Sequence, residues 1–169
     1  MKNFVLVFVC TGNTCRSPMA EGIMKDIVFH EASRHRIIPI EILSAGIQTL
    51  DGQPASLFAI EVAGEHGINL NFHKSRLLSS DIVRNADLIV TMEKYHSDYI
   101  HFKFPEANMV YELKNYPEGK ISDYELSGIP DPINQGIEAY RAVFDDLKHE
   151  LNRISQLIFR LVLKTHAMV

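Results

Sequence analysis

The sequence predicts an α/β fold in which a parallel sheet of four strands has helices on both faces. Short runs of β-branched and apolar residues alternate with helical patterns, and the first apolar run ends abruptly in a polar loop that opens a helix. With 169 residues, 46% of them hydrophobic, the chain fits a single domain over residues 1–169 that can bury its own core. We expect strands near residues 4–9, 39–44, 86–91 and 108–112, and helices near 17–30, 54–66, 79–85, 93–102 and 136–164.

The first predicted strand passes through a short loop into a helix start. Residues 4–9 form an apolar run of Phe, Val and Leu, which favours a strand. After the loop, Ser17 is suited to the N-cap position and Pro18 to the first helical turn, where its missing N–H costs nothing. Glu21 is expected where negative charge interacts favourably with the helix dipole. The positive N-terminal end of the predicted helix therefore faces the loop.

The loop itself has the composition of an anion site. Cys10 begins it and Arg16 ends it, which gives the spacing Cys-x5-Arg. A loop this short can turn successive backbone N–H groups inward around a tetrahedral oxyanion, while the guanidinium of Arg16 closes the ring. Gly12 and Asn13 favour the left-handed backbone that such a turn needs. A single cysteine at a strand end is more often a buried core residue than a nucleophile, but the whole pattern favours the nucleophile.

Composition and charge exclude several classes of protein. A net charge of −4 and a pI near 6.0 argue against a general nucleic-acid-binding protein. Both cysteines lie in one loop and cannot form a disulfide framework, and free thiols favour the cytoplasm. No apolar stretch is long enough for a membrane span, and the opening run is too short for a signal peptide. Most histidines are expected on the surface, and their spacing predicts no zinc site.

The last predicted helix, residues 136–164, carries an apolar seam. Its apolar residues recur in steps of three and four, at Ile137, Tyr140, Phe144, Leu147, Leu151, Ile154, Ile158 and Leu161. The first half of this seam is expected to pack on the sheet. Residues 157–163 are apolar nearly all round, which is more than one buried face requires. We therefore expect a homo-oligomer contact there, and we consider residues 157–169 as an apolar C-terminal extension of the domain.

The segment from Val9 to Glu21 resembles the phosphate loop of the low-molecular-weight protein tyrosine phosphatase family. The resemblance covers almost the whole chain and extends to Ser44-Ala45-Gly46, His73, Arg76, residues 86–92 and Asp131-Pro132. It implies a small flavodoxin-like fold with strand order 2-1-3-4. It also implies a phosphate loop at the carboxyl end of the first strand, where open α/β sheets bind their ligands.

If the chain hydrolyses phosphate monoesters, as the resemblance implies, the residues of this pattern have expected roles. Ionised Cys10 is the expected nucleophile, because a helix N-terminus, Arg16 and inward amides lower the pKa of a cysteine, and the product of its attack is a cysteinyl phosphate. The expected phosphate-binding residues are Thr11, Gly12, Asn13, Thr14, Cys15 and Arg16. Asp131 matches the position of the family's general acid, which protonates the leaving group and then activates water. We expect no metal and no cofactor.

The resemblance also implies supporting residues. Ser17 is expected to hydrogen-bond the thiolate, and Ser44 and His73 match positions that hold the phosphate loop through side-chain hydrogen bonds. Cys15 has two interpretations. It fills apolar space under the loop, or it forms a disulfide with Cys10 after oxidation and so protects the nucleophile from irreversible damage.

The identity of the phosphorylated side chain depends on two positions. Tyrosine-specific members commonly have a bulky aliphatic residue where this chain has Thr14, and an aromatic residue where it has Ile133. Phosphorylated proteins are the expected substrates, with phosphotyrosine first. Thr14 resembles the bacterial protein-arginine phosphatase branch, which makes phosphoarginine the alternative. A thioredoxin-coupled arsenate reductase is disfavoured because no cysteine follows Cys15, and an inactive phosphate-binding module is disfavoured because Cys10, Arg16 and Asp131 are all present.

Overall fold

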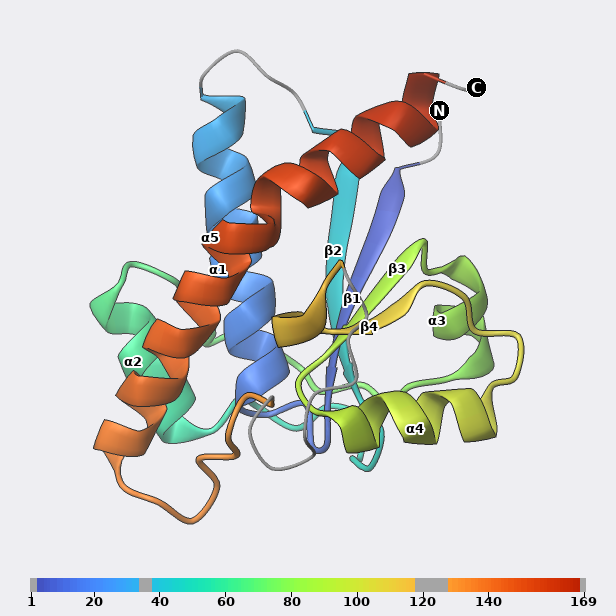
Figure 1. Cartoon of the computed structure of the whole chain (residues 1–169). Helices are drawn as coiled ribbons and strands as arrows, with labels where there is room; N and C mark the ends of the chain where they lie inside the picture. The colour runs from blue at the N-terminus through green and yellow to red at the C-terminus, as the bar shows by residue number, and fades with distance from the viewer. Residues whose placement is uncertain (1–2, 34–37, 118–127, 168–169) are drawn as a thin grey trace.

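A parallel sheet of four strands forms the centre of the molecule, in the order β2-β1-β3-β4 that was predicted (Figure 1). The computed structural model describes residues 3–33, 38–117 and 128–167. The strands are β1 (Phe4–Cys10), β2 (Ile40–Gly46), β3 (Leu88–Thr91) and β4 (Val110–Glu112). β1 pairs along its whole length with β2, from Phe4 opposite Ile40 to Cys10 opposite Gly46, and its other edge pairs with β3. The flavodoxin-like arrangement is therefore confirmed.

β1 lies inside the sheet, between β2 and β3, and all seven of its residues are buried. Alternate side chains of a strand point to opposite faces, so a strand covered on both sides must be apolar throughout. One face of β1 contributes Phe4, Leu6, Phe8 and Cys10 to the larger core cluster, and the other contributes Val5, Val7 and Val9 to the smaller one. The two clusters show that helices cover both faces of the sheet.

Three helices cover the larger core: α1 (Arg16–Ala32), α2 (Leu57–Glu65) and α5 (Ile137–Ala167). In Figure 1, α5 runs across α1 and α2 on one side of the sheet. The opposite face is covered by α3 (Ser80–Asn85) and α4 (Lys94–Lys103), and a short 3₁₀ turn, Leu113–Asn115, follows β4. α2 begins later than predicted because Ser56 is its N-cap and accepts a hydrogen bond from the N–H of Ala59.

The start of α1 differs from the prediction. Cys15, not Ser17, is the N-cap residue, and α1 begins at Arg16. Ser17 lies inside the first turn because its hydroxyl contacts the thiol of Cys10 and the amide of Asn13 instead of capping the helix. Pro18 is in the first turn as predicted. Glu21 lies beyond the first turn, so its predicted interaction with the helix dipole was wrong; its carboxylate accepts hydrogen bonds from Ser44 and Lys25.

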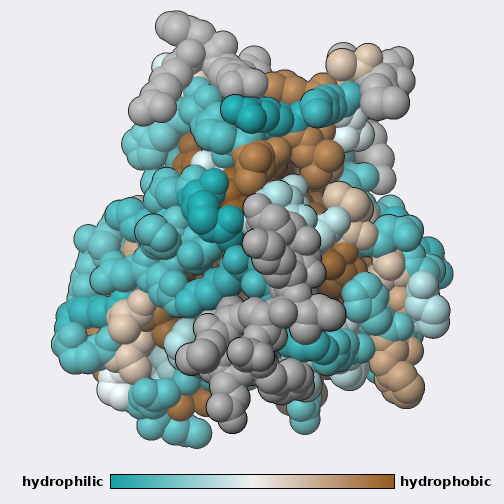
Figure 2. Space-filling view, viewed as in Figure 1, coloured by the Kyte–Doolittle hydropathy of each residue, from teal (hydrophilic) through white to brown (hydrophobic). Residues whose placement is uncertain are grey.

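The C-terminal half of α5 packs mainly within the chain. Ile158, Phe159 and Val162 are fully buried, while Leu157 and Leu161 are half-buried against the same core. On the face shown in Figure 2, hydrophilic residues dominate and hydrophobic surface gathers in the upper half. α5 is continuous through Ala167. Residues 168–169 of the predicted extension lie outside the described residues. None of the helices formed by the described residues is long and apolar enough to cross a membrane.

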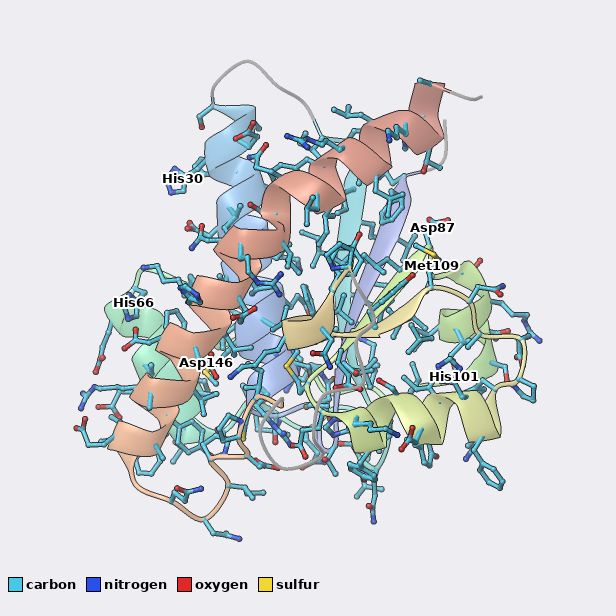
Figure 3. The ribbon with its side chains drawn as sticks, viewed as in Figure 1. His30, His66, Asp87, His101, Met109 and Asp146 are labelled. Atoms are coloured by element: carbon cyan, nitrogen blue, oxygen red, sulfur yellow. The ribbon has the colours of Figure 1, made fainter. Side chains whose placement is uncertain are left out.

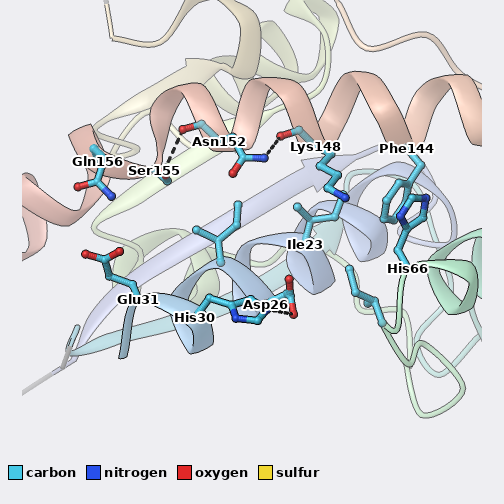
Figure 4. A pocket seen from close by; sticks show the side chains of 12 residues that line it. Ile23, Asp26, His30, Glu31, His66, Phe144, Lys148, Asn152, Ser155 and Gln156 are labelled. Atoms are coloured by element: carbon cyan, nitrogen blue, oxygen red, sulfur yellow. Dashed lines mark hydrogen bonds and ion pairs between the residues drawn. The ribbon is translucent and has the colours of Figure 1, made fainter. Parts of the chain in front are cut away.

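A groove of about 240 Å³ lies along the contact between α1 and α5 (Figure 4). Apolar residues such as Ile23 and Phe144 and polar residues such as Asp26 and Lys148 line it, and the ring of His66 stacks on Phe144 with 4.3 Å between the ring centroids. Its α1 residues come from Ile23 onward, well after the loop that precedes Arg16. The groove shares no lining residue with the predicted phosphate loop.

Candidate active site

The predicted phosphate loop lies at the carboxyl end of β1 and leads directly into α1. Asn13 has φ of +51°, so the prediction of a left-handed residue is confirmed there; Gly12 does not have a positive φ, and the prediction was wrong for it. The loop packs closely on the end of β2. A Cβ atom added to Gly46 would lie 2.7 Å from the carbonyl oxygen of Thr11, so only glycine fits at this contact.

The Cys10 thiol lies among hydrogen-bond partners at the base of the loop. Its Sγ atom is 3.0 Å from Oγ of Ser17 and accepts a hydrogen bond of 3.3 Å from the backbone N–H of Asn13. The residue is 2% exposed. Donors aimed at sulfur stabilise a thiolate more than a thiol, since the thiolate is the stronger acceptor.

Asn13 connects the loop to the segments around it. Its side-chain amide donates to Oγ of Ser17 and Oγ of Ser44, both at 2.9 Å, and its Oδ1 atom accepts from the backbone N–H of Arg76 at 2.9 Å. Its carbonyl oxygen accepts from Nε2 of His73 at 2.8 Å. Burial lowers the pKa of His73, which favours the neutral ring. Ser17, Ser44 and His73, all singled out in the sequence, thus meet at one buried asparagine.

Arg16 is almost completely buried and has three partners. Its Nη1 atom donates to the carboxylate of Glu93 and, at 3.0 Å, to the carbonyl oxygen of Ile129. Its Nη2 atom donates to Oδ2 of Asp131 at 2.6 Å. A guanidinium has five N–H donors. Within the described part of the chain, these contacts leave the Nε–H and one Nη2–H of the guanidinium without a partner, so Arg16 still has two donors to offer an oxyanion.

Asp131 lies at the edge of the loop in a constrained turn. Its Oδ1 atom accepts from the backbone N–H of Ile133 at 3.1 Å, and its carbonyl oxygen accepts from the side chain of Gln135 at 2.8 Å. Its side chain is 37% exposed, whereas that of Arg16 is 2% exposed. Both residues predicted to determine specificity are accessible, since Ile133 is 55% exposed and Thr14 is half-buried.

Two residues at the start of α4 were missed by the sequence interpretation. Glu93 pairs with Arg16, and His96 contacts Thr11, with 3.0 Å between Nε2 and Oγ1. Burial, and next the charge of Arg16, lowers the pKa of His96 to about 3. His96 is an exception to the expectation that most histidines lie on the surface. The expectation holds for His30, His66 and His101, which are labelled in Figure 3 and exposed.

A signal for Glu93 and His96 was present in the sequence. Both follow the predicted strand 86–91, and ligand sites of open α/β sheets collect residues from the carboxyl ends of neighbouring strands. That rule would have placed them beside the phosphate loop.

The second cysteine has partners of its own. The Sγ atom of Cys15 lies 3.3 Å from the hydroxyl oxygens of both Ser56 and Tyr140, and both Cys10 and Cys15 are free thiols. Burial, together with the hydrogen bond to Cys15, raises the pKa of Tyr140 to about 12, so its hydroxyl stays protonated. The predicted disulfide between Cys10 and Cys15 stays a prediction. The described residues contain no cluster of three or more His, Cys, Asp or Glu side chains suited to a metal ion.

This site on a flavodoxin-like sheet, with a cysteine and an arginine at the two ends of an amide loop, defines a class of cysteine-dependent phosphatases. The family model described as low molecular weight phosphotyrosine protein phosphatase matches residues 5–163. A protein-arginine-phosphatase of Geobacillus stearothermophilus is 34% identical over 152 residues, which are 89% of this chain and 93% of that protein. The low molecular weight protein-tyrosine-phosphatase Wzb of Escherichia coli K12 is 34% identical over 158 residues, 94% of this chain and 97% of that protein.

The solved structures give the same result. A YwlE arginine phosphatase mutant with a phosphorylated active-site serine superposes with a TM-score of 0.82 at 31% identity, over 92% of this chain and 95% of that chain. The chain belongs to the low molecular weight phosphotyrosine protein phosphatase family. It is a hydrolase that acts on phosphorylated proteins by the cysteine-based mechanism general to that family.

Proposed function

We propose that Cys10 is the nucleophile and that the loop from Thr11 to Arg16 binds the phosphoryl group. The observation that carries this is the placement of the thiol: Ser17 and the Asn13 amide both contact Sγ, and the helix α1 begins beside it. The thiolate attacks phosphorus, the sulfur–phosphorus bond forms and the bond to the leaving group breaks. Arg16 and the loop amides stabilise the charge on the three equatorial oxygens.

Asp131 is proposed as the general acid and base. The leaving group departs with a pair of electrons and takes the proton of the Asp131 carboxyl group. In the second step the resulting carboxylate removes a proton from water, which attacks phosphorus and releases the Cys10 thiolate. The position and the partial exposure of the side chain support this role: the carboxyl group lies beside Arg16 and, at 37% exposure, is accessible from outside.

We propose phosphotyrosine as the substrate residue. Ile133, whose backbone N–H donates to the Asp131 carboxylate, is 55% exposed, and an aryl ring can pack on such an apolar side chain. Phosphoarginine is the second candidate, and Thr14 favours it, because its half-buried hydroxyl offers a polar contact to a guanidinium. The relatives include both a protein-arginine-phosphatase and a protein-tyrosine-phosphatase at 34% identity.

The experiment compares hydrolysis of an aryl phosphate, a phosphotyrosine peptide and a phosphoarginine peptide. Wild-type protein is expected to hydrolyse the aryl phosphate with inhibition by vanadate, and Cys10→Ser is expected to lose that turnover while retaining its fold. The ratio of kcat/KM for the two peptides then decides the substrate residue. Turnover that persists in Cys10→Ser contradicts the proposed nucleophile.

The cytoplasm is the proposed location, and a homodimer or larger homo-oligomer is the proposed assembly. Two free thiols beside a reactive site support a reducing compartment. For the dimer, the half-buried Leu157 and Leu161 offer apolar surface on the C-terminal half of α5, in the segment 157–169 that we propose as an extension of a single domain. A monomeric mass at high micromolar concentration contradicts the dimer.

A further inference from the structure

The N-terminal end of α4 contacts the phosphate loop at both of its ends. Glu93, the N-cap residue, pairs with Arg16 at the end of the loop, and His96 contacts Thr11 at its beginning. The two residues are also bonded to each other, because Nδ1 of His96 accepts from the backbone N–H of Glu93 at 3.1 Å. One short segment after β3 therefore holds the loop from the side opposite β2.

The hydrogen bonds of His96 fix its proton. A backbone N–H is a donor, so Nδ1 must be the unprotonated nitrogen, and the neutral ring then carries its proton on Nε2. Nε2 is therefore the donor, and Oγ1 of Thr11 is the acceptor at 3.0 Å. The side chain is fully buried. A buried imidazole with both nitrogens bonded has one orientation, so its contact with Thr11 is rigid.

Thr11 is also held on its other side. Its carbonyl oxygen accepts from the backbone N–H of Gln48 at 2.9 Å, and the carbonyl oxygen of Cys10 accepts from Ile47 at 3.0 Å. The backbone after β2 thus secures the peptide groups, whereas His96 secures the side chain of Thr11. With both contacts in place, the first residue after the nucleophile cannot rotate, and the direction of the amides that follow it is set.

We propose that His96 is a positioning residue of this phosphatase, which acts through Thr11 to hold the phosphate loop in the form that binds the transferred phosphoryl group. The inference rests on the proposed function of the loop. A neutral donor suits the position, because a cation there would be repelled by Arg16 and would compete with it for the carboxylate of Glu93. Small displacements of a catalytic loop are costly to the rate, since alignment of the reacting atoms depends on it.

The experiment separates the two nitrogens of His96. In His96→Gln the side-chain amide reaches the place of Nε2 and retains a donor to Thr11. In His96→Asn the side chain reaches only the place of Nδ1, so it retains the bond to Glu93 and loses the donor. Thr11→Val removes the acceptor at nearly constant volume. His101→Asn, an exposed histidine on the same helix, is the matched control.

We expect His96→Asn to lower kcat for an aryl phosphate roughly ten-fold and to weaken vanadate and phosphate binding by a similar factor, which corresponds to the loss of one buried hydrogen bond. His96→Gln is expected to recover most of both. Thr11→Val is expected to match His96→Asn, and the double variant to be no worse than either single one, because both remove the same contact. His101→Asn is expected to behave as the wild type.

Three results overturn the inference: equal losses in His96→Gln and His96→Asn, losses that multiply in the double variant, or a lower melting temperature with unchanged kcat and phosphate affinity. Phosphate affinity, measured by calorimetry, separates this inference from the proposed function. If wild-type protein turns over and the variants match it in kcat and affinity, the positioning role is wrong and the function stands. If nothing turns over but His96→Asn binds phosphate more weakly, the function is wrong and the positioning role stands.

Discussion

Nη2 of Arg16 lies 2.6 Å from Oδ2 of Asp131, although 115 positions of sequence separate the two residues. The guanidinium is buried and the carboxyl group is 37% exposed, so the pair spans the boundary between the interior and the mouth of the loop. The group proposed to bind phosphate and the group proposed to protonate the leaving group are thus in contact before substrate arrives.

Asp131→Asn is expected to reduce kcat for an ordinary aryl phosphate about 100- to 1,000-fold, because the amide cannot transfer a proton to the leaving group. The loss is expected to shrink for aryl phosphates whose phenol has a low pKa, since such leaving groups depart without protonation. Steady-state kinetics over a series of phenols measures this dependence. Asp145→Asn, at an exposed position of α5, is the control. A loss that is the same for every phenol contradicts the role of Asp131 as an acid.

Glu93→Gln is expected to destabilise the free protein by about 2 kcal/mol, because it leaves the buried charge of Arg16 with one carboxylate fewer. For a chain of this size that corresponds to a fall of roughly 4 to 8 °C in Tm. Saturating phosphate is expected to narrow the difference, since a bound dianion compensates the same guanidinium. Thermal melts with and without phosphate test this, with Glu138→Gln on the exposed start of α5 as control. A difference that phosphate leaves unchanged contradicts the explanation.

The stability of the protein is expected to fall as the pH decreases from about 6.5 to 5. Burial and the charge of Arg16 lower the pKa of His96 to about 3, while the unfolded chain binds a proton at its ordinary pKa of 6.5. The unfolded state therefore takes up more protons in this window, so ΔG of unfolding falls with pH by up to about 2 kcal/mol for this residue. Burial also lowers the pKa of His73, which adds a loss of the same sign.

Urea unfolding at pH 7, 6 and 5 measures this slope for the wild type and His96→Gln. The groups that face the ring are Arg16, Thr11, the backbone N–H of Glu93 and the ring of Tyr95, whose centroid is 4.8 Å from that of His96. The variant keeps all of these groups and removes only the imidazole that takes up a proton on unfolding. Its free energy of unfolding is therefore expected to depend less on pH than that of the wild type. Equal slopes in the two proteins contradict the lowered pKa of His96.

The first strand and the phosphate loop could be predicted because their signals are local, whereas the strand order followed from the family resemblance. β1 is a continuous apolar run that ends at Cys10, and Arg16 follows in the same short loop, at the spacing Cys-x5-Arg. Ser17 shows where a prediction from neighbouring residues fails. Its position before a proline fits an N-cap. In the folded chain the loop curls so that Asn13 and Cys10, four and seven residues earlier, both contact its hydroxyl, and a capping pattern does not take this curl into account.

Glu93 and His96 could not be recognised as site residues from local pattern alone. His96 meets Thr11 across 85 positions of sequence, and Glu93 meets Arg16 across 77. A histidine two positions after a lysine in a polar helix start has the composition of a surface residue. The signal lies in the topology: the parallel pairing of β1 with β3, which the predicted strand order already contained, brings the two carboxyl ends together and places this helix start beside the phosphate loop.

Peroxide is expected to inactivate the wild type reversibly and Cys15→Ala irreversibly. The thiolate of Cys10 is oxidised to a sulfenic acid, and attack by the Cys15 thiol releases water and forms the disulfide, which an added dithiol reduces. Activity recovered after dithiol treatment is the measurement. Tyr140→Phe is a further variant, because it removes a hydroxyl that contacts the Cys15 sulfur at 3.3 Å and shows whether this contact affects the rate of disulfide formation. Equal recovery in wild type and Cys15→Ala contradicts the protective role.

Thr14→Ile is expected to shift the preference of the enzyme toward phosphotyrosine. The Thr14 side chain is half-buried in the phosphate loop, and replacing its hydroxyl with an aliphatic group favours contact with an aryl ring and removes a polar contact available to a guanidinium. Paired kinetics on phosphotyrosine and phosphoarginine peptides give the ratio of the two kcat/KM values, which is expected to change about ten-fold. Ile133→Phe, at the exposed rim beside Asp131, tests the second position in the same assay. A ratio unchanged by Thr14→Ile would show that specificity is determined outside the phosphate loop.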